Sequence, residues 1–193
     1  MLFRSAAAVN AIPFGTNPSD VFSVTVSDGI ATTSQTYTIN LTGANDAPTL
    51  AAVTAGSVAD AQNAATLGSS ANLYGTLSGS DVDTGNTKTY GISSPTSSSA
   101  NYTSSASGSA VTYNISKTGS YGTLYIESAT GNYLYVADAA AVNAIPFGTN
   151  PSDSFSVTVS DGIATTSQTY TINLTGANDA PTLAAVKIGR AHV

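Results

Sequence analysis

The 193-residue chain contains no cysteine and no tryptophan, one histidine, and few charged residues. Charged side chains make up 8% of it, against roughly a quarter in an average globular protein. Without cysteine there is no disulfide, so a core, a metal or neighbouring domains must stabilise the fold. The low charge does not make the chain disordered, because 41% of its residues are hydrophobic.

The acidic residues are almost all of one kind, since Glu127 is the only glutamate among 11 acids. Glutamate favours helices, whereas aspartate favours turns and metal sites, so this bias argues against helices and points toward calcium. The net charge of −6 argues against a basic surface that binds nucleic acid. No apolar run is long enough to span a membrane, so we expect no membrane insertion.

The missing residue types also argue against an enzyme. Apart from His192, no histidine or cysteine is available as a general base or a thiol nucleophile. Glu127 has no obvious carboxylate partner for glycoside hydrolysis, and no glycine-rich phosphate loop precedes a helix. We therefore expect no catalytic residues in this chain.

Both ends of the chain resemble translated sequencing adapters. Residues 188–193 resemble one frame of a short-read adapter, and residues 2–5 resemble a frame of its reverse complement. We therefore expect residues 1–5 and the end of 183–193 to be scars, with frayed native termini as the alternative. No role is assigned to His192.

What the chain does contain is a long internal repeat. Residues 6–53 recur as residues 139–186, and the 48 positions differ once, Val21 against Ser154. A tandem array with recent duplication accounts for this pattern, and an assembly error is the alternative. The offset of 133 residues is too long for a solenoid repeat and suits one β-sandwich domain.

Alternating apolar and polar residues predict short strands throughout the repeat. The runs 155–160 and 169–175 alternate at period two around an Asp-Gly turn, which predicts an antiparallel hairpin. Further strands are predicted at 73–77, 87–92, 111–115, 121–127 and 133–136, with a helical turn at 139–145 and a Ser-rich surface loop at 93–109. About seven strands predict an all-β, Ig-like or cadherin-like antiparallel sandwich.

The repeat and the strands together divide the chain. We expect residues 49–182 to form one complete module, preceded by the C-terminal part of another in 6–48 and followed in 183–193 by the next linker and a scar. About 40 residues cannot bury a sufficient core alone. Because 6–46 nearly duplicates 139–179, we also expect strand exchange or dimerisation between copies.

A series of short motifs resembles the VCBS repeat family, which consists of cadherin-like modules of large bacterial adhesins and calcium-dependent secreted proteins. The motifs are Tyr74-Gly75-Thr76-Leu77, Ser80-Asp81-Val82-Asp83, Tyr121-Gly122-Thr123-Leu124, Ser160-Asp161-Gly162 and Asn178-Asp179-Ala180-Pro181. The resemblance implies a cadherin-like sandwich, an extracellular location, and neighbouring modules of the same chain as partners. Where family members place a Gly-Gly pair after the turn, this chain has Ile163-Ala164.

The loops offer oxygen ligands, of which calcium takes six to eight. If residues 73–77 form the first strand, alternating strand directions bring one set of side chains to a single pole of the sandwich: Asp81, Asp83, Asp153, Asn178 and Asp179. A cation there would relieve the repulsion between carboxylates. Asn45, Asp46 and Asp161 form a second, weaker set at the opposite pole. The alternative is structural, since Asp-rich turns and Asn-Asp-Ala-Pro linkers need no metal.

The sequence therefore predicts a structural spacer of a repetitive bacterial surface or secreted adhesin, stiffened by calcium at the junctions between modules. Any cell-surface or glycan ligand would bind through other parts of the protein. The alternative function is a carbohydrate-binding sandwich that uses its ten tyrosines. An exposed row of tyrosines would favour glycan binding, whereas buried tyrosines with acids at the poles would favour a spacer.

Overall fold

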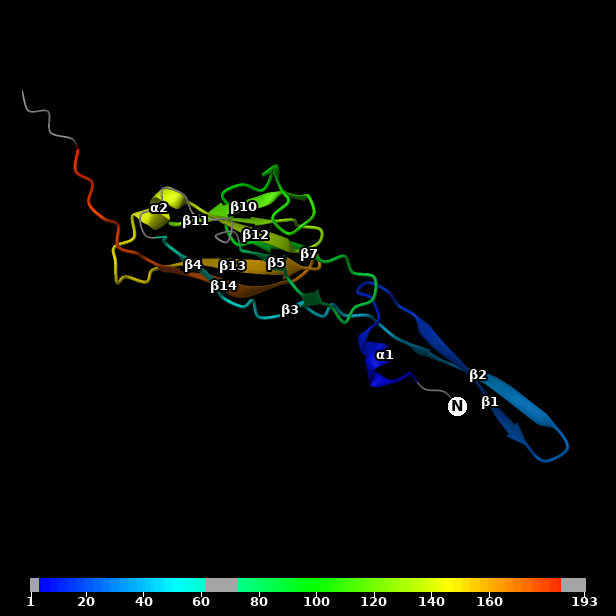
Figure 1. The fold of residues 1–193 in the computed structure, drawn as a ribbon. Coiled ribbons are helices and arrows are strands. Elements are labelled where there is room, and N and C mark those ends of the chain that lie inside the picture. The colour runs from blue at the N-terminus through cyan, green and yellow to red at the C-terminus, as the bar shows by residue number, and fades with distance from the viewer. Residues whose placement is uncertain (1–3, 62–72, 185–193) are drawn as a thin grey trace, which may run out of the picture.

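A computed structural model describes residues 4–61 and 73–184, and it shows two layers of β-sheet with a separate hairpin projecting from one end (Figure 1). The strand orders are β10-β11-β12-β5 in the first sheet and β4-β14-β13-β7 in the second. This confirms the predicted β-sandwich, with eight strands in its two main sheets within the described residues. The predicted C-terminal scar at 188–193, and His192 with it, lies outside the described residues.

The first sheet is built from the middle of the chain. Its strands are β5 (Leu73–Thr76), β10 (Ile115–Thr118), β11 (Gly122–Ile126) and β12 (Asn132–Ala137). The strands β11 and β12 form the predicted hairpin, and β5 pairs antiparallel with the other edge of β12. Alternate residues of β11 are buried, as expected for a strand with one face on a core.

The second sheet is centred on the duplicated segment. Its strands β13 (Ser152–Ser160) and β14 (Thr165–Thr175) form the predicted hairpin, flanked by β7 (Thr89–Ile92) and β4 (Gly56–Ala59). Because β4 runs parallel to β14, the predicted purely antiparallel pairing is wrong at this edge. The sequence gives little signal for β4, since three of its four residues are Gly, Ser and Ala.

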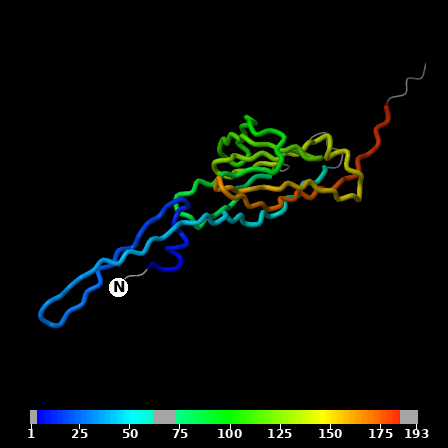
Figure 2. Tube along the Cα trace, turned by 180° about the vertical axis from the view of Figure 1, so that it is seen from behind, coloured from blue at the N-terminus to red at the C-terminus, as the bar shows by residue number. Residues whose placement is uncertain are grey.

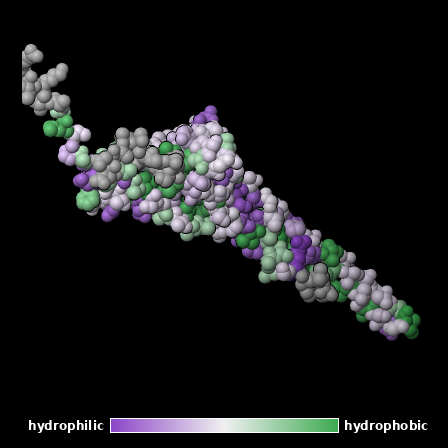
Figure 3. Space-filling model, in the orientation of Figure 1, coloured by the Kyte–Doolittle hydropathy of each residue, from purple (hydrophilic) through white to green (hydrophobic). Residues whose placement is uncertain are grey.

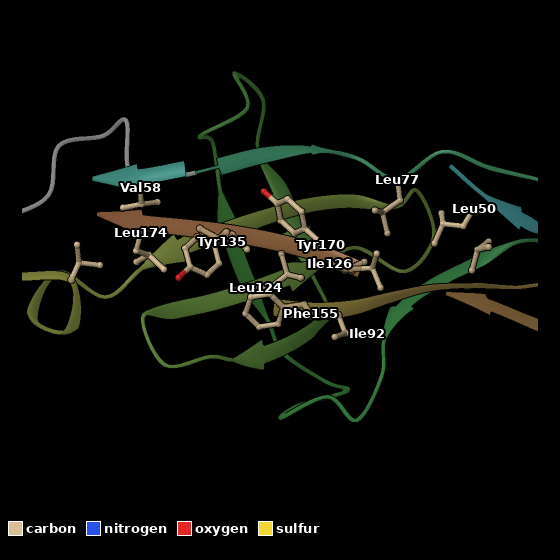
Figure 4. Close-up of a cluster of buried hydrophobic side chains, with 14 of the residues drawn as sticks. Leu50, Val58, Leu77, Ile92, Leu124, Ile126, Tyr135, Phe155, Tyr170 and Leu174 are labelled. Carbon is tan, nitrogen blue, oxygen red and sulfur yellow. The ribbon is translucent and has the colours of Figure 1, made fainter. Parts of the chain in front are cut away.

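The core lies between the inner faces of the two sheets (Figure 4). The hairpin β13–β14 contributes Phe155, Val157, Val159, Tyr170, Ile172 and Leu174, all of them at most 2% exposed. The first sheet contributes Leu124, Ile126 and Tyr135, which are fully buried. Burial of each such side chain stabilises the fold by about 1.5–3 kcal/mol, so the closure of the sheets over this hairpin dominates stability.

The Ser-rich segment predicted as a surface loop has structure of its own. It contains β8 (Tyr102–Ser104), which pairs with β9 (Val111–Tyr113). The Tyr102 ring stacks on Tyr125 of β11 with a centroid distance of 4.3 Å, so the segment covers the outer face of the first sheet. The single strand predicted at 111–115 is divided, because β9 and β10 pair with different partners on either side of Asn114.

The first copy of the duplicated segment forms α1 (Ala6–Asn10), β1 (Ser19–Ser27) and β2 (Thr32–Asn40). Its hairpin projects away from the sandwich in both views (Figures 1 and 2). The second copy begins with α2 (Ala139–Asn143), which confirms the predicted helical turn. Among the described residues, no helix is long and apolar enough to cross a membrane.

The duplicated valines provide a matched test of the core. Val159 is fully buried, whereas its counterpart Val26 is 71% exposed. We expect Val159→Ala to lower the free energy of unfolding by about 1–3 kcal/mol, because it leaves a cavity. The control Val26→Ala should change it by no more than about 0.5 kcal/mol. Urea denaturation of both variants measures the difference, and equal effects would contradict this assignment of the core.

Candidate functional site

One pole of the sandwich is formed by the incoming linker and the tip of the β13–β14 hairpin; we call it the linker pole. The Thr166 hydroxyl donates to the carbonyl oxygen of Pro48, which fixes the linker beside the start of β14. The Asn45 side-chain amide donates to Asp161 Oδ2 at 2.9 Å. The predicted proximity of Asp161 to the linker residues is therefore confirmed.

The loop that contains Asp81 and Asp83 lies at the same pole. It is held there because β3 (Thr49–Leu50) pairs antiparallel with β6 (Gly79–Ser80), which directly precedes it. The backbone N–H of Asp46 donates to Asp83 Oδ2 at 2.8 Å, and the N–H of Asp83 donates to Asp81 Oδ1 at 2.9 Å. A network of hydrogen bonds thus joins the linker to both aspartates.

Several oxygen atoms at the linker pole are buried without a hydrogen-bond partner. They are Asn45 Oδ1, Asp81 Oδ2 and Asp83 Oδ1. Asp83 is only 4% exposed, and leaving a carboxylate oxygen unpaired at such a depth is costly. Carboxylate and amide oxygens are the ligands that calcium takes, so this donor set fits that ion.

No three acidic, histidine or cysteine side chains in the described part of the chain are gathered so that they form a metal site by themselves. The unpartnered oxygens at the linker pole instead belong to two carboxylates and one amide, and Asp46 follows the amide residue, Asn45, in the chain. A calcium ion there would have to draw on amide, main-chain or water oxygens as well as carboxylates, as calcium sites commonly do.

Asp161 also stabilises its own turn. Its Oδ1 accepts hydrogen bonds from the backbone N–H groups of Ala164 and Ile163, and these hold the pKa of the Asp161 carboxyl below its usual value of 3.8. Asp28, its counterpart in the first copy, has the same turn bonds and a pKa lowered in the same direction. The turn thus forms without the linker, and the bond from Asn45 is what distinguishes Asp161 from Asp28.

The predicted grouping of Asp153 with Asp81 and Asp83 is wrong. Seven residues of β13 lie between Asp153 and Asp161, and Asp161 is at the linker pole. The prediction assumed that the strands at 87–92 and 111–115 run in opposite directions. Instead β7 and β10 both run away from the linker pole, because residues 93–114 bring the chain back between them. Asn178 and Asp179 follow the end of β14 and lie at the far pole, where the chain leaves the sandwich (Figure 2).

Asp153 has a structural role that the sequence did not reveal. It is 3% exposed and accepts three hydrogen bonds, from the Tyr135 hydroxyl at 2.8 Å and from the backbone N–H groups of Ser120 and Tyr121. Burial raises the pKa of the Tyr135 phenol, and the bond to Asp153 raises it further. The carboxylate therefore joins the two sheets internally, and both of its oxygens are already hydrogen-bonded.

Replacing this carboxylate by an amide tests its role. Asp153→Asn would turn an NH₂ group toward groups that are themselves donors, so we expect a loss of about 2–4 kcal/mol in the free energy of unfolding. The control is Asp20→Asn in the first copy, where Asp20 forms an exposed ion pair with Arg4 at 2.8 Å. That change should cost at most about 1 kcal/mol. Denaturant unfolding of the two variants compares them, and a harmless Asp153→Asn would refute the assignment.

The far pole contains one acidic residue that sequence analysis missed. Asp60 is 8% exposed, its Oδ2 accepts from the N–H of Ala177 at 3.3 Å, and its Oδ1 is buried without a partner. It follows β4, so it was overlooked together with that strand. Asn178 and Asp179, the counterparts of Asn45 and Asp46, directly follow Ala177 in the chain, and Asp179 is exposed.

The tyrosines do not form an exposed row. Tyr113, Tyr135 and Tyr170 are at most 2% exposed, and only Tyr37 and Tyr74 are more than half exposed among the described tyrosines. Tyr37 lies on the projecting hairpin and Tyr74 on the edge strand β5, so the two do not share one sheet face. By the criterion set from the sequence, this distribution favours packing over a glycan-binding platform.

No family model matches the chain, and no curated protein matches it. Among solved structures, it is similar to an EC3-6 structure of protocadherin gammaB7, with a TM-score of 0.39 and 14% identity over 84% of this chain and 33% of that one. It is also similar to Drosophila N-cadherin EC1-4, with a TM-score of 0.35, 12% identity, and coverage of 83% and 33%.

An endo-fucoidan hydrolase of glycoside hydrolase family 107 is similar at a TM-score of 0.36 and 16% identity, over 89% of this chain and 20% of that one. The chain thus spans a third or less of these three proteins. Similarity at this level assigns no activity.

Proposed function

We propose that the chain is a structural spacer module of a repetitive bacterial surface or secreted adhesin, located outside the cell and supporting adhesion or biofilm formation. The observation that carries this proposal is the placement of one linker sequence at both ends of the sandwich. Asn45 to Pro48 enters at one pole, and the identical residues 178–181 leave at the other. Modules with this arrangement join end to end, which suits an extended array. The resemblance to VCBS repeats supports the same function.

We further infer that calcium binds at the linker pole and stiffens the junction. Asn45, Asp81 and Asp83 would hold the ion through their buried unpartnered oxygens, with Asp46 and Asp161 beside them. A bound cation would neutralise these carboxylates and fix the angle between the linker and the module. By repetition, Asn178 and Asp179 would belong to the next junction, together with a following module.

Contacts across the existing junction support a structural role for the linker between neighbouring modules. The Thr84 hydroxyl donates to the carbonyl oxygen of Ala11 at 3.1 Å, which ties the loop after Asp83 to the preceding segment. The neighbouring modules of the same chain are therefore the proposed partners. Adhesive ligands would bind elsewhere in the protein, since the tyrosine distribution offers no platform for a glycan here.

Calcium titration tests this proposal directly. A ligand that binds only the native state raises its stability, by about 2.7 kcal/mol when its concentration is 100 times the dissociation constant. We therefore expect calcium to raise the melting temperature of the module and EDTA to reverse the effect, as followed by circular dichroism. An unchanged melting temperature at millimolar calcium would contradict calcium binding.

Two substitutions locate the ion. Asp83→Asn retains an acceptor for the Asp46 N–H but removes a charge, so we expect calcium affinity measured by calorimetry to fall roughly tenfold or more. Asp161→Asn should also weaken binding, whereas the control Asp28→Asn changes the same turn in the first copy and should leave affinity unchanged. Equal affinities in all three variants would place the ion elsewhere.

A further inference from the structure

The projecting β1–β2 hairpin carries an apolar face that nothing in the described part of the chain covers. Val24, Val26 and Tyr37 are 56%, 71% and 59% exposed, whereas their counterparts Val157, Val159 and Tyr170 are 0%, 0% and 2% exposed. Figure 3 shows hydrophobic surface along this hairpin. Exposed apolar surface of this kind usually marks an interaction site.

The second copy of the same sequence shows what fits this face. Within one chain, the β13–β14 hairpin is flanked by β4 and β7 and covered by β11 and β12, all of which belong to residues 49–138. We call residues 49–138 the front half. Because residues 6–46 differ from 139–179 only at Val21, the front half is complementary to both hairpins.

The hairpin β1–β2 already has the conformation that the front half holds. Phe22 is paired with Tyr37 in β1–β2 as Phe155 is paired with Tyr170 in β13–β14. The one differing position, Val21 against Ser154, is exposed in both copies and therefore lies on the face away from the front half. No residue that would contact the front half differs between the two hairpins.

The buried carboxylate follows the same correspondence. Asp20 is the counterpart of Asp153, which accepts a hydrogen bond from Tyr135 of the front half. In the uncovered hairpin, Asp20 is paired with Arg4 instead. On docking, Asp20 would exchange this exposed partner for the buried donors.

We propose that the uncovered face of β1–β2 is a docking surface for the front half of a second copy of this chain. It would enter in the position that β13 and β14 hold within one copy. This proposal does not depend on calcium binding, because the apolar face of the hairpin, and not the ligand set of the linker pole, is what the front half covers.

The length of the linker excludes the same contact within one chain. If β2 took the place of β14, Thr42 would take the position of Thr175, which is paired with Ala59. Pro48 is held beside Thr166, which lies nine residues before Thr175 in the same strand. The linker from Thr42 to Pro48 would therefore have to run back along nine residues of the strand. Nine strand residues span about 30 Å. The six residue steps from Thr42 to Pro48 reach at most about 22 Å. The front half must therefore come from another copy, with this segment joining two sandwiches end to end.

The stoichiometry determines when exchange appears. Each chain holds two hairpins and one front half, so docking of β1–β2 on a second copy displaces the resident β13–β14. The number of covered hairpin faces then stays the same, so exchange buries no additional apolar surface in the unmodified chain. If the resident hairpin is disabled, each front half accepts the β1–β2 hairpin of the next chain, and this head-to-tail contact repeats from chain to chain as a ring or an open series.

The duplication supplies a matched experiment in the full chain. In Val157→Asp, a charge enters the buried face of the resident hairpin, so we expect cooperative folding to persist through exchange. Size-exclusion chromatography with light scattering should give masses at multiples of 19.2 kDa that increase with concentration. The control Val24→Asp changes the identical position of β1–β2 and should remain a folded monomer.

The double variant Val24→Asp with Val157→Asp has no intact hairpin, and it should lose cooperative unfolding in circular dichroism. The proposal is overturned if Val157→Asp unfolds as the double variant does, or if it stays a folded monomer at every concentration. It is also overturned if the double variant forms the same multiples, because the association would then be aggregation rather than docking.

Discussion

Burial of one face of the β13–β14 hairpin under the first sheet is the interaction on which the rest of this structure depends. Six side chains of the hairpin fill the space between the sheets, and the Asp153–Tyr135 hydrogen bond crosses the same space. The nearly identical sequence in β1–β2 pairs in the same register with most of that face exposed. Local sequence thus specifies the hairpin, and the front half supplies the burial that stabilises it.

The closed sandwich in turn builds the linker pole. Because β13 and β14 are fixed side by side, their turn holds Asp161 where the incoming linker can reach it. The short pairing of β3 with β6 then brings the Asp81–Asp83 loop against the same linker. Three segments that are distant in sequence meet there, and two of them hold buried unpartnered oxygens, a combination that packing alone does not explain.

Most of the fold was predictable because its strands carry a clear pattern. The β13–β14 hairpin alternates apolar and polar residues, and both it and the β11–β12 hairpin contain turn residues, so period and turn chemistry identify them. The short strands β3, β4 and β8 were not predictable, because each is fixed by a neighbour rather than by its own residues. The predicted alternation of strand directions fails between β7 and β10, which both run away from the linker pole, so Asp153 was grouped with the wrong partners.

The repeat places two different demands on the same 48 residues. In the second copy, the inner face must pack against a front half from its own chain, while the linker that follows must lead to the next module. Since the connection from Thr42 to Pro48 is too short to fold back, each hairpin is directed away from the module that follows it. A short linker therefore keeps neighbouring modules in order even when their sequences are nearly identical. The short linker allows a hairpin to pair with the front half of another chain. It prevents the hairpin from pairing with the module that follows it in the same chain. Proximity in a tandem array would otherwise favour that second pairing.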